Sequence, residues 1–254
     1  MKVSIITVVY NNKKTIKDTI ESVLNQTYKN IEYIIIDGAS KDGTIDIIKS
    51  YGDKIDVFIS EPDNGLYDAM NKGIKLSTGD VIGILNSDDF YVDKFVIEKV
   101  ASKFKESNCD SLYGDLVYVD FNNTNKVVRY WKSKPFENNL FQKGWHPPHP
   151  TFFVKKEIYN KYGLFDLNFK IAADYEIMLR FLEKYRISSV YLPEVLVKMR
   201  IGGKSNKSFK NILLANIESY NAWKKNNLSI NPFNIMLKPM SKITQYFKSP
   251  SSHT

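Results

Sequence analysis

Short apolar segments alternate with amphipathic helical segments through the first half of this chain, and that order restricts it to few folds. The apolar segments have the length and composition of buried strands, at residues 3–9, 31–37, 55–60 and 81–85. The segments between them repeat apolar side chains at helical spacing, at residues 15–26, 46–50 and 66–76. Strands that alternate with helices pair in parallel through right-handed crossovers. We therefore predict an α/β fold with a mostly parallel central sheet flanked by helices.

The second half of the chain has a different pattern. Predicted strands here are residues 110–120, 126–131, 187–192 and 195–200. Predicted helices are residues 95–104, 154–162, 174–182 and 209–223. In the last of these helices, Ile212, Leu213 and Ile217 are among the side chains available for packing. The predicted organisation is a main domain of residues 1–205, with halves 1–109 and 110–205, and a helical, basic tail of residues 206–254.

Polar side chains follow each of the four predicted parallel strands. These polar segments are residues 10–12, 37–44, 61–65 and 86–89. Turn chemistry explains their Gly, Asn and Ser residues, but not an acid on three successive strands. The carboxyl ends of parallel strands are where open α/β sheets bind ligands. Asp88 and Asp89 are adjacent carboxylates, which suit Mg²⁺ or Mn²⁺; helix capping is the alternative, although Asp93 can cap the next helix itself.

The positive charge of the chain is concentrated near its end. The net charge is +8, yet from Lys198 onward nine lysines and one arginine accompany a single acid, Glu218, so the rest of the chain is near neutral. This pattern suggests an anionic surface or ligand at the tail, with solvated surface charge as an equal alternative, and no nucleic-acid groove. Residues 236–247 add an apolar stripe at helical spacing, so the tail can lie on an anionic membrane or dock on its own domain.

Several protein classes are excluded. The single cysteine, Cys109, rules out a disulfide framework and a cysteine metal cluster, and it fits a reducing cytoplasm. No G-x-G-x-x-G follows the first strand, and residues 203–205 lack the glycine and the strand context of a P-loop. We find no secretory signal pattern and no apolar run near the ~20 residues of a spanning helix. We therefore expect a cytoplasmic protein that is soluble or bound to a membrane only from outside.

Two further stretches carry candidate chemistry. Asp174 precedes the buried helical run 177–182, where it can be a routine helix cap or a carboxylate that takes a proton from a hydroxyl. Position alone leaves both interpretations open. Residues 146–150 hold two histidines among prolines, which forbid the helix that would align them on a metal, so a loop that lines a pocket is favoured.

With these residues in hand, the chain resembles the family 2 glycosyltransferases, which have the GT-A fold, and in particular bacterial polysaccharide enzymes of the colanic-acid and lipopolysaccharide type. The resemblance runs from Val3 to about Ser205, and the order of the motifs is more specific than any one of them. Residues 6–11 look like the first strand of the family, whose end contacts the nucleobase. Residues 37–44 look like its D-x-S-x-D-G-T turn, and residues 202–205 like the G-G-x-S segment that closes the site.

The resemblance implies a role for each motif residue. For the donor, a nucleotide sugar and specifically a UDP-sugar, it implies contacts from Tyr10, Asp37, Asp63, Asn71, Asn86 and Asp88. Asn86 stands first in the place of the D-x-D motif and brings no charge, so Asp88 and Asp89 would hold the Mn²⁺ or Mg²⁺. Asp174 matches the catalytic base of the family. The residues implied on the acceptor side are His149, Tyr175 and Glu176.

The implied reaction is a single inverting displacement. It would move a hexosyl or N-acetylhexosaminyl group to a hydroxyl of a glycan or polyprenyl-linked acceptor. The reaction would belong to surface polysaccharide synthesis at the inner face of the cell membrane.

Two other protein classes stay open. A sugar-nucleotidyltransferase is expected to have a glycine-rich basic loop after the first strand, which residues 10–14 lack. A non-catalytic carbohydrate-binding protein has no need for acids aligned at a sheet edge.

Overall fold

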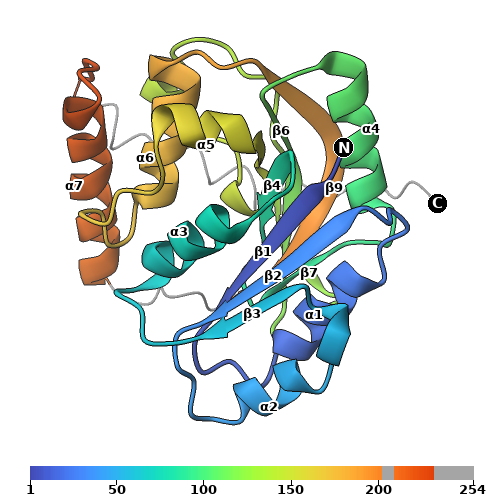
Figure 1. The fold of residues 1–254 in the computed structure, drawn as a ribbon. Helices are drawn as coiled ribbons and strands as arrows, with labels where there is room; N and C mark the ends of the chain where they lie inside the picture. Colours follow the sequence, from blue (N-terminus) through green and yellow to red (C-terminus); the bar gives the residue numbers. More distant parts are fainter. Residues whose placement is uncertain (202–208, 232–254) are drawn as a thin grey trace.

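The computed structural model describes residues 1–201 and 209–231, and its centre is one mixed sheet (Figure 1). Within these residues, the strand order is β3-β2-β1-β4-β8-β6-β9-β5, with β7 paired to β6. The strands are β1 Val3–Val9, β2 Ile31–Asp37, β3 Val57–Ser60, β4 Val81–Ile84, β5 Asp89–Tyr91, β6 Ser111–Val119, β7 Val127–Trp131, β8 Phe153–Lys155 and β9 Ser189–Arg200.

The first four strands pair in parallel, as predicted. β1 lies between β2 and β4 and runs parallel to both, and β3 extends the sheet beyond β2. The second half continues the sheet through β8, which is antiparallel to both β4 and β6, and then returns to a parallel pair, β6 and β9. β5 pairs antiparallel with β9, and β7 pairs antiparallel with β6. The predicted α/β class is confirmed.

Helices cover both faces of the sheet (Figure 1). The helices are α1 Ile16–Leu24, α2 Thr44–Lys49, α3 Leu66–Leu76, α4 Val96–Ser107, α5 Lys156–Tyr162, α6 Ala173–Leu179 and α7 Phe209–Lys225. One hydrophobic core joins one face of the sheet to α3, α5, α6 and α7, and the other joins the opposite face to α1, α2 and α4. A π-helical turn, Arg180–Lys184, continues α6. Short 3-10 turns lie at Gly52–Lys54, Phe141–Lys143 and His149–Thr151.

Strand β1 is buried along its whole length and separates the two cores. Val3 and Ile5 pack with α1 and α4, whereas Ile6 and Val8 pack with α3 and α6. A strand that is covered on both faces must be apolar at successive positions, which explains the continuous apolar run in the sequence. The helices on the two faces of the sheet thus belong to two separate cores.

Two predicted element boundaries are wrong. The helix predicted at residues 154–162 begins two residues later, as α5, because the residues before it form β8 between β4 and β6. Long-range strand pairing overrides the local helical spacing there. The strands predicted at residues 187–192 and 195–200 are one strand, β9, whose register against β6 shifts near Asp115.

Helix α7 packs through a different face than its sequence suggests. Ile212, Leu213 and Ile217 were the apolar side chains expected to pack, but they are 44%, 55% and 50% exposed. Ala222 and Trp223 are buried in the core with α6 instead. The helix therefore presents an apolar surface to its surroundings.

The end of the chain falls partly outside the described residues. The predicted domain boundary at residue 205 and the apolar stripe predicted at residues 236–247 both lie there. Among the described residues, no helix is both long and apolar enough to cross a membrane.

A buried carboxylate ties together the amino-terminal edge of the sheet. Glu32, in β2, accepts hydrogen bonds from Ser4 Oγ (2.5 Å) and from the main-chain N–H (2.7 Å) and Oγ1 (2.5 Å) of Thr78. Lys2 Nζ lies 2.9 Å from the same carboxylate. Burial favours the neutral acid, but these hydrogen bonds outweigh it and lower the pKa of Glu32 to about 2.

We expect Glu32→Gln to destabilise the protein at neutral pH. Because the folded-state pKa is lower than the unfolded one, this carboxylate stabilises the fold above the unfolded pKa, and the stabilisation is lost as pH falls toward 2. The variant should lose roughly 2 kcal/mol of unfolding free energy at pH 7. The difference from the wild type should shrink between pH 5 and pH 2. Denaturant titrations at several pH values measure it, with the exposed Glu157→Gln as the control. A difference in unfolding free energy between the two proteins that stays constant with pH would contradict this account.

Candidate functional site

The carboxyl ends of β1, β2 and β4 meet at one edge of the sheet, and their turns are bonded to one another. The main-chain N–H of Asn11 donates to Ser40 Oγ at 2.7 Å. Asn12 Nδ2 donates to Ser87 Oγ at 2.8 Å. The turn after β1 is therefore attached to the turns after β2 and β4, which brings the predicted polar segments together.

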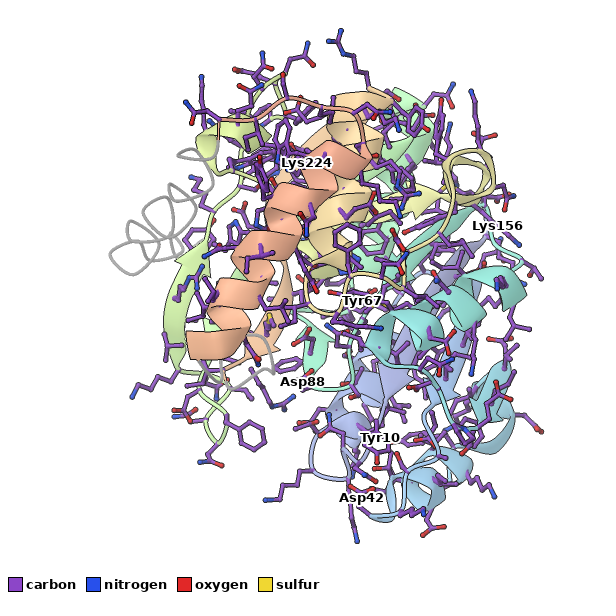
Figure 2. All side chains as sticks on the ribbon, turned by 90° about the vertical axis from the view of Figure 1, so that its left-hand side faces the viewer. Tyr10, Asp42, Tyr67, Asp88, Lys156 and Lys224 are labelled. Carbon is purple, nitrogen blue, oxygen red and sulfur yellow. The ribbon has the colours of Figure 1, made fainter. Side chains whose placement is uncertain are left out.

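Tyr10, which follows β1 directly, faces an open space at this edge. Its side chain is 58% exposed. A Cβ atom on Gly38 would lie 3.3 Å from Tyr10 Cδ2 and 2.5 Å from Asp63 Oδ2, so only glycine lets these groups approach. The N–H of Gly65 holds the other Asp63 oxygen at 2.8 Å. Figure 2 shows Tyr10, Asp88 and Tyr67 along the same side of the molecule.

Asp37, one of the predicted donor contacts, is fully buried and bonded within the protein. Its Oδ1 accepts from Ser40 Oγ at 2.5 Å, and its Oδ2 accepts from the Ser40 N–H (2.9 Å) and Ser60 Oγ (2.7 Å). These bonds hold the turn after β2 against β3. A direct contact with the donor stays a prediction.

The turn after β4 contains the two adjacent carboxylates. Asp88 is partly exposed, whereas Asp89 is fully buried at the start of β5. This burial, together with the charge of Asp88, raises the pKa of Asp89 well above its usual value. Asn86 Nδ2 donates to Asp89 Oδ2 at 3.3 Å. In contrast, Oδ1 of Asn86 and Oδ1 of Asp89 are buried and accept no hydrogen bond from the part of the chain that is described.

These oxygens fit a divalent cation that is shared with a ligand. Two buried acceptors without donors are costly unless a hydrogen-bond donor or a cation reaches them. Carboxylate and amide oxygens are the ligands that Mg²⁺ and Mn²⁺ prefer. Within residues 1–201 and 209–231, no group of three His, Cys, Asp or Glu side chains could hold a metal. The remaining ligands would have to be phosphate oxygens and water.

Asp174 comes from the second half of the chain, in the first turn of α6. The helix is preceded by Ala172, so Asp174 is not its N-cap residue. Its Oδ1 accepts from the Tyr175 N–H (2.8 Å) and from the Tyr67 hydroxyl (3.3 Å). The Tyr67 hydroxyl also lies 2.7 Å from the carbonyl oxygen of Ile171. Tyr67 thus connects α3, which follows the turn after β3, with the residues around Asp174.

Residues 4–163 match the glycosyl transferase family 2. The chain belongs to this family. An uncharacterized glycosyltransferase of Rickettsia typhi is 35% identical over 228 residues, which cover 87% of this chain and 69% of the relative. An uncharacterized glycosyltransferase of Mycobacterium tuberculosis is 34% identical over 185 residues, 70% of this chain and 68% of the relative. A PGL/p-HBAD biosynthesis glycosyltransferase of Mycobacterium bovis is 26% identical and covers 80% of this chain and 78% of the relative.

The fold of this family 2 glycosyltransferase is also that of solved enzymes. Residues 1–349 of Staphylococcus aureus TarS in complex with UDP-GlcNAc match it with a TM-score of 0.67 at 16% identity, over 94% of this chain and 70% of the other. The mannosyltransferase PcManGT of Pyrobaculum calidifontis, in complex with GDP-Man and Mn²⁺, matches with a TM-score of 0.64 at 14% identity, over 94% and 69%. At such low identity the likeness establishes the fold alone, and it is the predicted GT-A fold.

The three residues predicted on the acceptor side of this glycosyltransferase are all buried. Glu176 forms an ion pair with Arg180 at 2.9 Å. Burial lowers the pKa of His149, although the charge of Asp174 opposes the shift. Tyr175 is held in the core beside α7. These side chains build the structure behind Asp174, and their contact with an acceptor stays a prediction.

Sequence reasoning missed an aromatic cluster beside α6. Its members are Tyr113, Phe136, Phe141, Trp145 and Tyr191. Trp145 lies 5.9 Å from Tyr113 and 6.3 Å from Phe136 between ring centroids, and no described residue accepts a hydrogen bond from its buried Nε1. The signal in the sequence was only the high aromatic content, since these rings come from four separate segments. Tyr67 was missed because a tyrosine in an amphipathic helix is usually a core residue.

Asn71, the predicted donor contact in α3, is engaged inside the protein. Its Nδ2 donates to the carbonyl of Phe165 at 2.8 Å, and its Oδ1 accepts from the Phe165 N–H at 2.9 Å. Both ends of the amide are thus occupied by the main chain of one residue, Phe165, in the loop before α6. The same loop packs on Tyr67, whose ring stacks on Phe165 at 5.6 Å.

We expect Asn71→Ala to lower stability more than donor affinity. The change leaves a buried N–H and a buried C=O of Phe165 without partners, which should cost roughly 2 kcal/mol of unfolding free energy. Thermal and denaturant unfolding measure this, with the exposed Asn64→Ala as control. A stable Asn71→Ala variant that binds nucleotide sugar much more weakly would restore the predicted donor contact.

Proposed function

We propose that this family 2 enzyme is an inverting glycosyltransferase that uses a UDP-sugar. It transfers a hexosyl or N-acetylhexosaminyl group to a hydroxyl of a glycan or polyprenyl-linked glycan in surface polysaccharide synthesis. The observation that carries the proposal is that Asp174, from the second half of the chain, is bonded to the first half, which contains the candidate donor site. The exposed ring of Tyr10 and the unsatisfied oxygens of Asn86 and Asp89 belong to turns at one sheet edge. The carboxylate of Asp174 is linked to the neighbouring α3 through Tyr67.

The donor occupies the edge formed by the turns after β1, β2 and β4. The ring of Tyr10 and the carboxylate of Asp63, separated only by Gly38, form the place for the nucleobase and ribose. Among similar folds, the TarS structure is in complex with UDP-GlcNAc and the PcManGT structure with GDP-Man and Mn²⁺. Nucleotide sugars of both kinds therefore suit this fold, and the uridine preference rests on the resemblance of the turn at residues 37–44.

A divalent cation, Mn²⁺ or Mg²⁺, fits beside Asp88. The partly exposed Asp88 carboxylate would hold it, with Oδ1 of Asp89 and the Asn86 amide oxygen as the further acceptors. When bound, such a cation offsets the charge of a diphosphate leaving group. Arg200 donates to the carbonyl oxygen of Asp88 at 2.9 Å and so fixes the main chain of this turn.

Asp174 is the base in this proposal. The acceptor oxygen forms a bond with the anomeric carbon, the bond from that carbon to the diphosphate oxygen breaks, and the hydroxyl proton passes to the Asp174 carboxylate. Hydrogen bonds from the described residues reach only Oδ1, so Oδ2 is the oxygen that takes the proton. The neighbouring bonds hold the carboxylate in one orientation, which supplies part of the rate acceleration.

We also propose that the protein works at the inner face of the cell membrane, as a cytoplasmic, peripheral protein. The exposed side chains of Ile212, Leu213 and Ile217 in α7 support this, because they are large and apolar, and Leu213 and Ile217 lie one turn apart on the same side of the helix. The excess of lysine after Lys198 supplies the charge that attracts anionic lipids.

We expect Asp174→Asn to lower the rate of sugar transfer by about 10³-fold while nucleotide affinity changes little. The amide keeps the shape of the side chain but takes up no proton. The assay supplies a panel of nucleotide sugars and a polyprenyl-linked acceptor, with Mn²⁺, Mg²⁺ or a chelator, and measures nucleoside diphosphate release. Asp53→Asn, an exposed carboxylate far along the chain, is the control.

The outcomes of this assay separate the competing classes. Near-normal transfer by Asp174→Asn would reject the base assignment. Release of pyrophosphate would indicate a sugar-nucleotidyltransferase instead. Binding without consumption of any donor, in any metal, would indicate a non-catalytic carbohydrate-binding protein. Sugar transfer that continues in the presence of the chelator would reject the proposed requirement for a divalent cation.

For the membrane proposal, we expect the triple change Ile212→Gln, Leu213→Gln and Ile217→Gln to weaken binding to anionic vesicles by about tenfold or more. Glutamine keeps the helix propensity of α7, so loss of the helix is not the cause. Cosedimentation with phosphatidylglycerol vesicles measures it, and Leu76→Gln is the matched control at another exposed apolar position. Binding that is absent in the wild type, or equal in the triple variant, would reject the proposal.

A further inference from the structure

The buried face of α7 forms hydrogen bonds with the segment that contains Asp174. Four side chains at helical spacing, Glu218, Ala222, Trp223 and Asn226, are buried on this face. They lie beyond residues 4–163, which match the family. Each of the polar ones makes a hydrogen bond to α6 or to the three residues before it, and none bonds to Asp174 itself.

Glu218, in a different helix, binds the main chain that directly precedes α6. The Lys170 N–H donates to its Oε1 at 2.8 Å. The N–H groups of Ile171 (2.9 Å) and Ala172 (2.8 Å) donate to its Oε2. Ala172, at the N-cap position, has no side chain able to cap the helix. The carboxylate therefore satisfies three successive main-chain donors, and its charge suits the positive end of the helix.

The main chain bound by Glu218 ends two residues before Asp174 and shares partners with it. Ile171 donates its N–H to Glu218, and its carbonyl lies 2.7 Å from the Tyr67 hydroxyl, which also reaches Asp174 Oδ1. Burial raises the pKa of Tyr67 well above its usual value, and the charges of Asp174 and Glu218 add to the shift. A single connected set of bonds therefore runs from Glu218 to the carboxylate of Asp174.

Two more bonds fix the residues that directly follow Asp174. Trp223 Nε1 donates to the hydroxyl of Tyr175 at 2.9 Å. Asn226 Nδ2 donates to Glu176 Oε1 at 2.9 Å. With Glu218 before Asp174 and these two after it, α7 holds the chain on both sides of the proposed base.

We propose that Glu218 is a positioning residue for sugar transfer: its carboxylate fixes the main chain at residues 170–172 and so sets the place of Asp174 relative to the acceptor hydroxyl. The inference rests on the proposed role of Asp174 as the base. A slightly misplaced Asp174 carboxylate can still accept a proton, but it meets the acceptor hydroxyl less often in a productive geometry.

The test is Glu218→Gln in the full-length enzyme. Glutamine has one acceptor oxygen and turns an NH₂ group toward the main-chain N–H groups, so at least one bond is lost. We expect kcat to fall by about tenfold or more, while KM for the nucleotide sugar and the affinity for nucleoside diphosphate change less than about twofold. Circular dichroism and the folded fraction are measured on the same samples.

The matched control is Glu183→Gln. Glu183, in the π-helical turn after α6, also accepts main-chain N–H groups, those of Asn139 (3.1 Å) and Phe141 (3.3 Å), but these belong to a different loop. Its change should leave kcat within about twofold of the wild type. Should Glu218→Gln fail to fold, Trp223→Phe replaces it, because phenylalanine keeps an aromatic ring and removes one bond to Tyr175; kcat should again fall without a change in KM.

A double variant separates positioning from a general structural role. If Glu218 acts through Asp174, then Glu218→Gln should not slow the residual reaction of the Asp174→Asn enzyme further. An equal loss in both backgrounds, or a wild-type kcat for Glu218→Gln beside an inactive Asp174→Asn enzyme, would overturn the inference and leave the proposed function intact. Normal transfer by Asp174→Asn alone would reject the base assignment, and the inference with it.

Discussion

The parallel pairing of β1 with β2 on one side and β4 on the other is the interaction on which the rest of the structure depends. Val9 lies opposite Asp37, and Ile6 lies opposite Ile84, so the ends of three strands reach one edge. Each apolar residue of β1 is buried in one of two cores, and Ser4 and Thr7 are buried as well. A slip of one residue would exchange the two faces of β1 and move Tyr10 away from the turns it now adjoins. The register is therefore set by packing, and the site follows from it.

The sequence predicted this part of the fold because local pattern and long-range structure agree there. Successive apolar residues require a strand covered on both faces, and the helices at 15–26 and 66–76 have one apolar face each. The polar residues after each strand could then be placed at one edge without knowledge of any contact. For Asp174, its place before a buried helix left open whether it is a helix cap or a base, and the base role came from the family resemblance. The structure removes the alternative that it is the N-cap, and the base role stays a proposal.

The features that the sequence did not reveal depend on partners far along the chain. β8 is a strand because β4 and β6 leave a place between them, although its own residues continue a helical pattern. Asn71 bonds to Phe165, which is 94 residues away, and no local pattern distinguishes that role from a donor contact. Helix α7 has apolar side chains on two faces, and only the tertiary contacts show that the face with Trp223 is buried and the face with Leu213 is exposed.

The buried acids of this enzyme differ in whether the described residues supply a hydrogen-bond donor to each of their oxygens. Asp37 is fully buried, and each of its oxygens has a donor within the protein. Asp115 is equally buried, and it accepts from Tyr130, Ser133 and Tyr191.

The turn after β4 is different, because Asn86 and Asp89 each leave one buried oxygen without a donor among the described residues. Burial of an unpaired acceptor destabilises a fold, so a chain that keeps two of them side by side needs something else to satisfy them. In the proposed donor site, a cation held with a diphosphate would do so without any further side chain, since its other ligands would arrive with the substrate. The uncharged Asn86 in the first position of the motif would then have a physical consequence. The protein side of the proposed site carries less negative charge than it would with an acid there, so tight binding of the cation would depend on the phosphates of the donor.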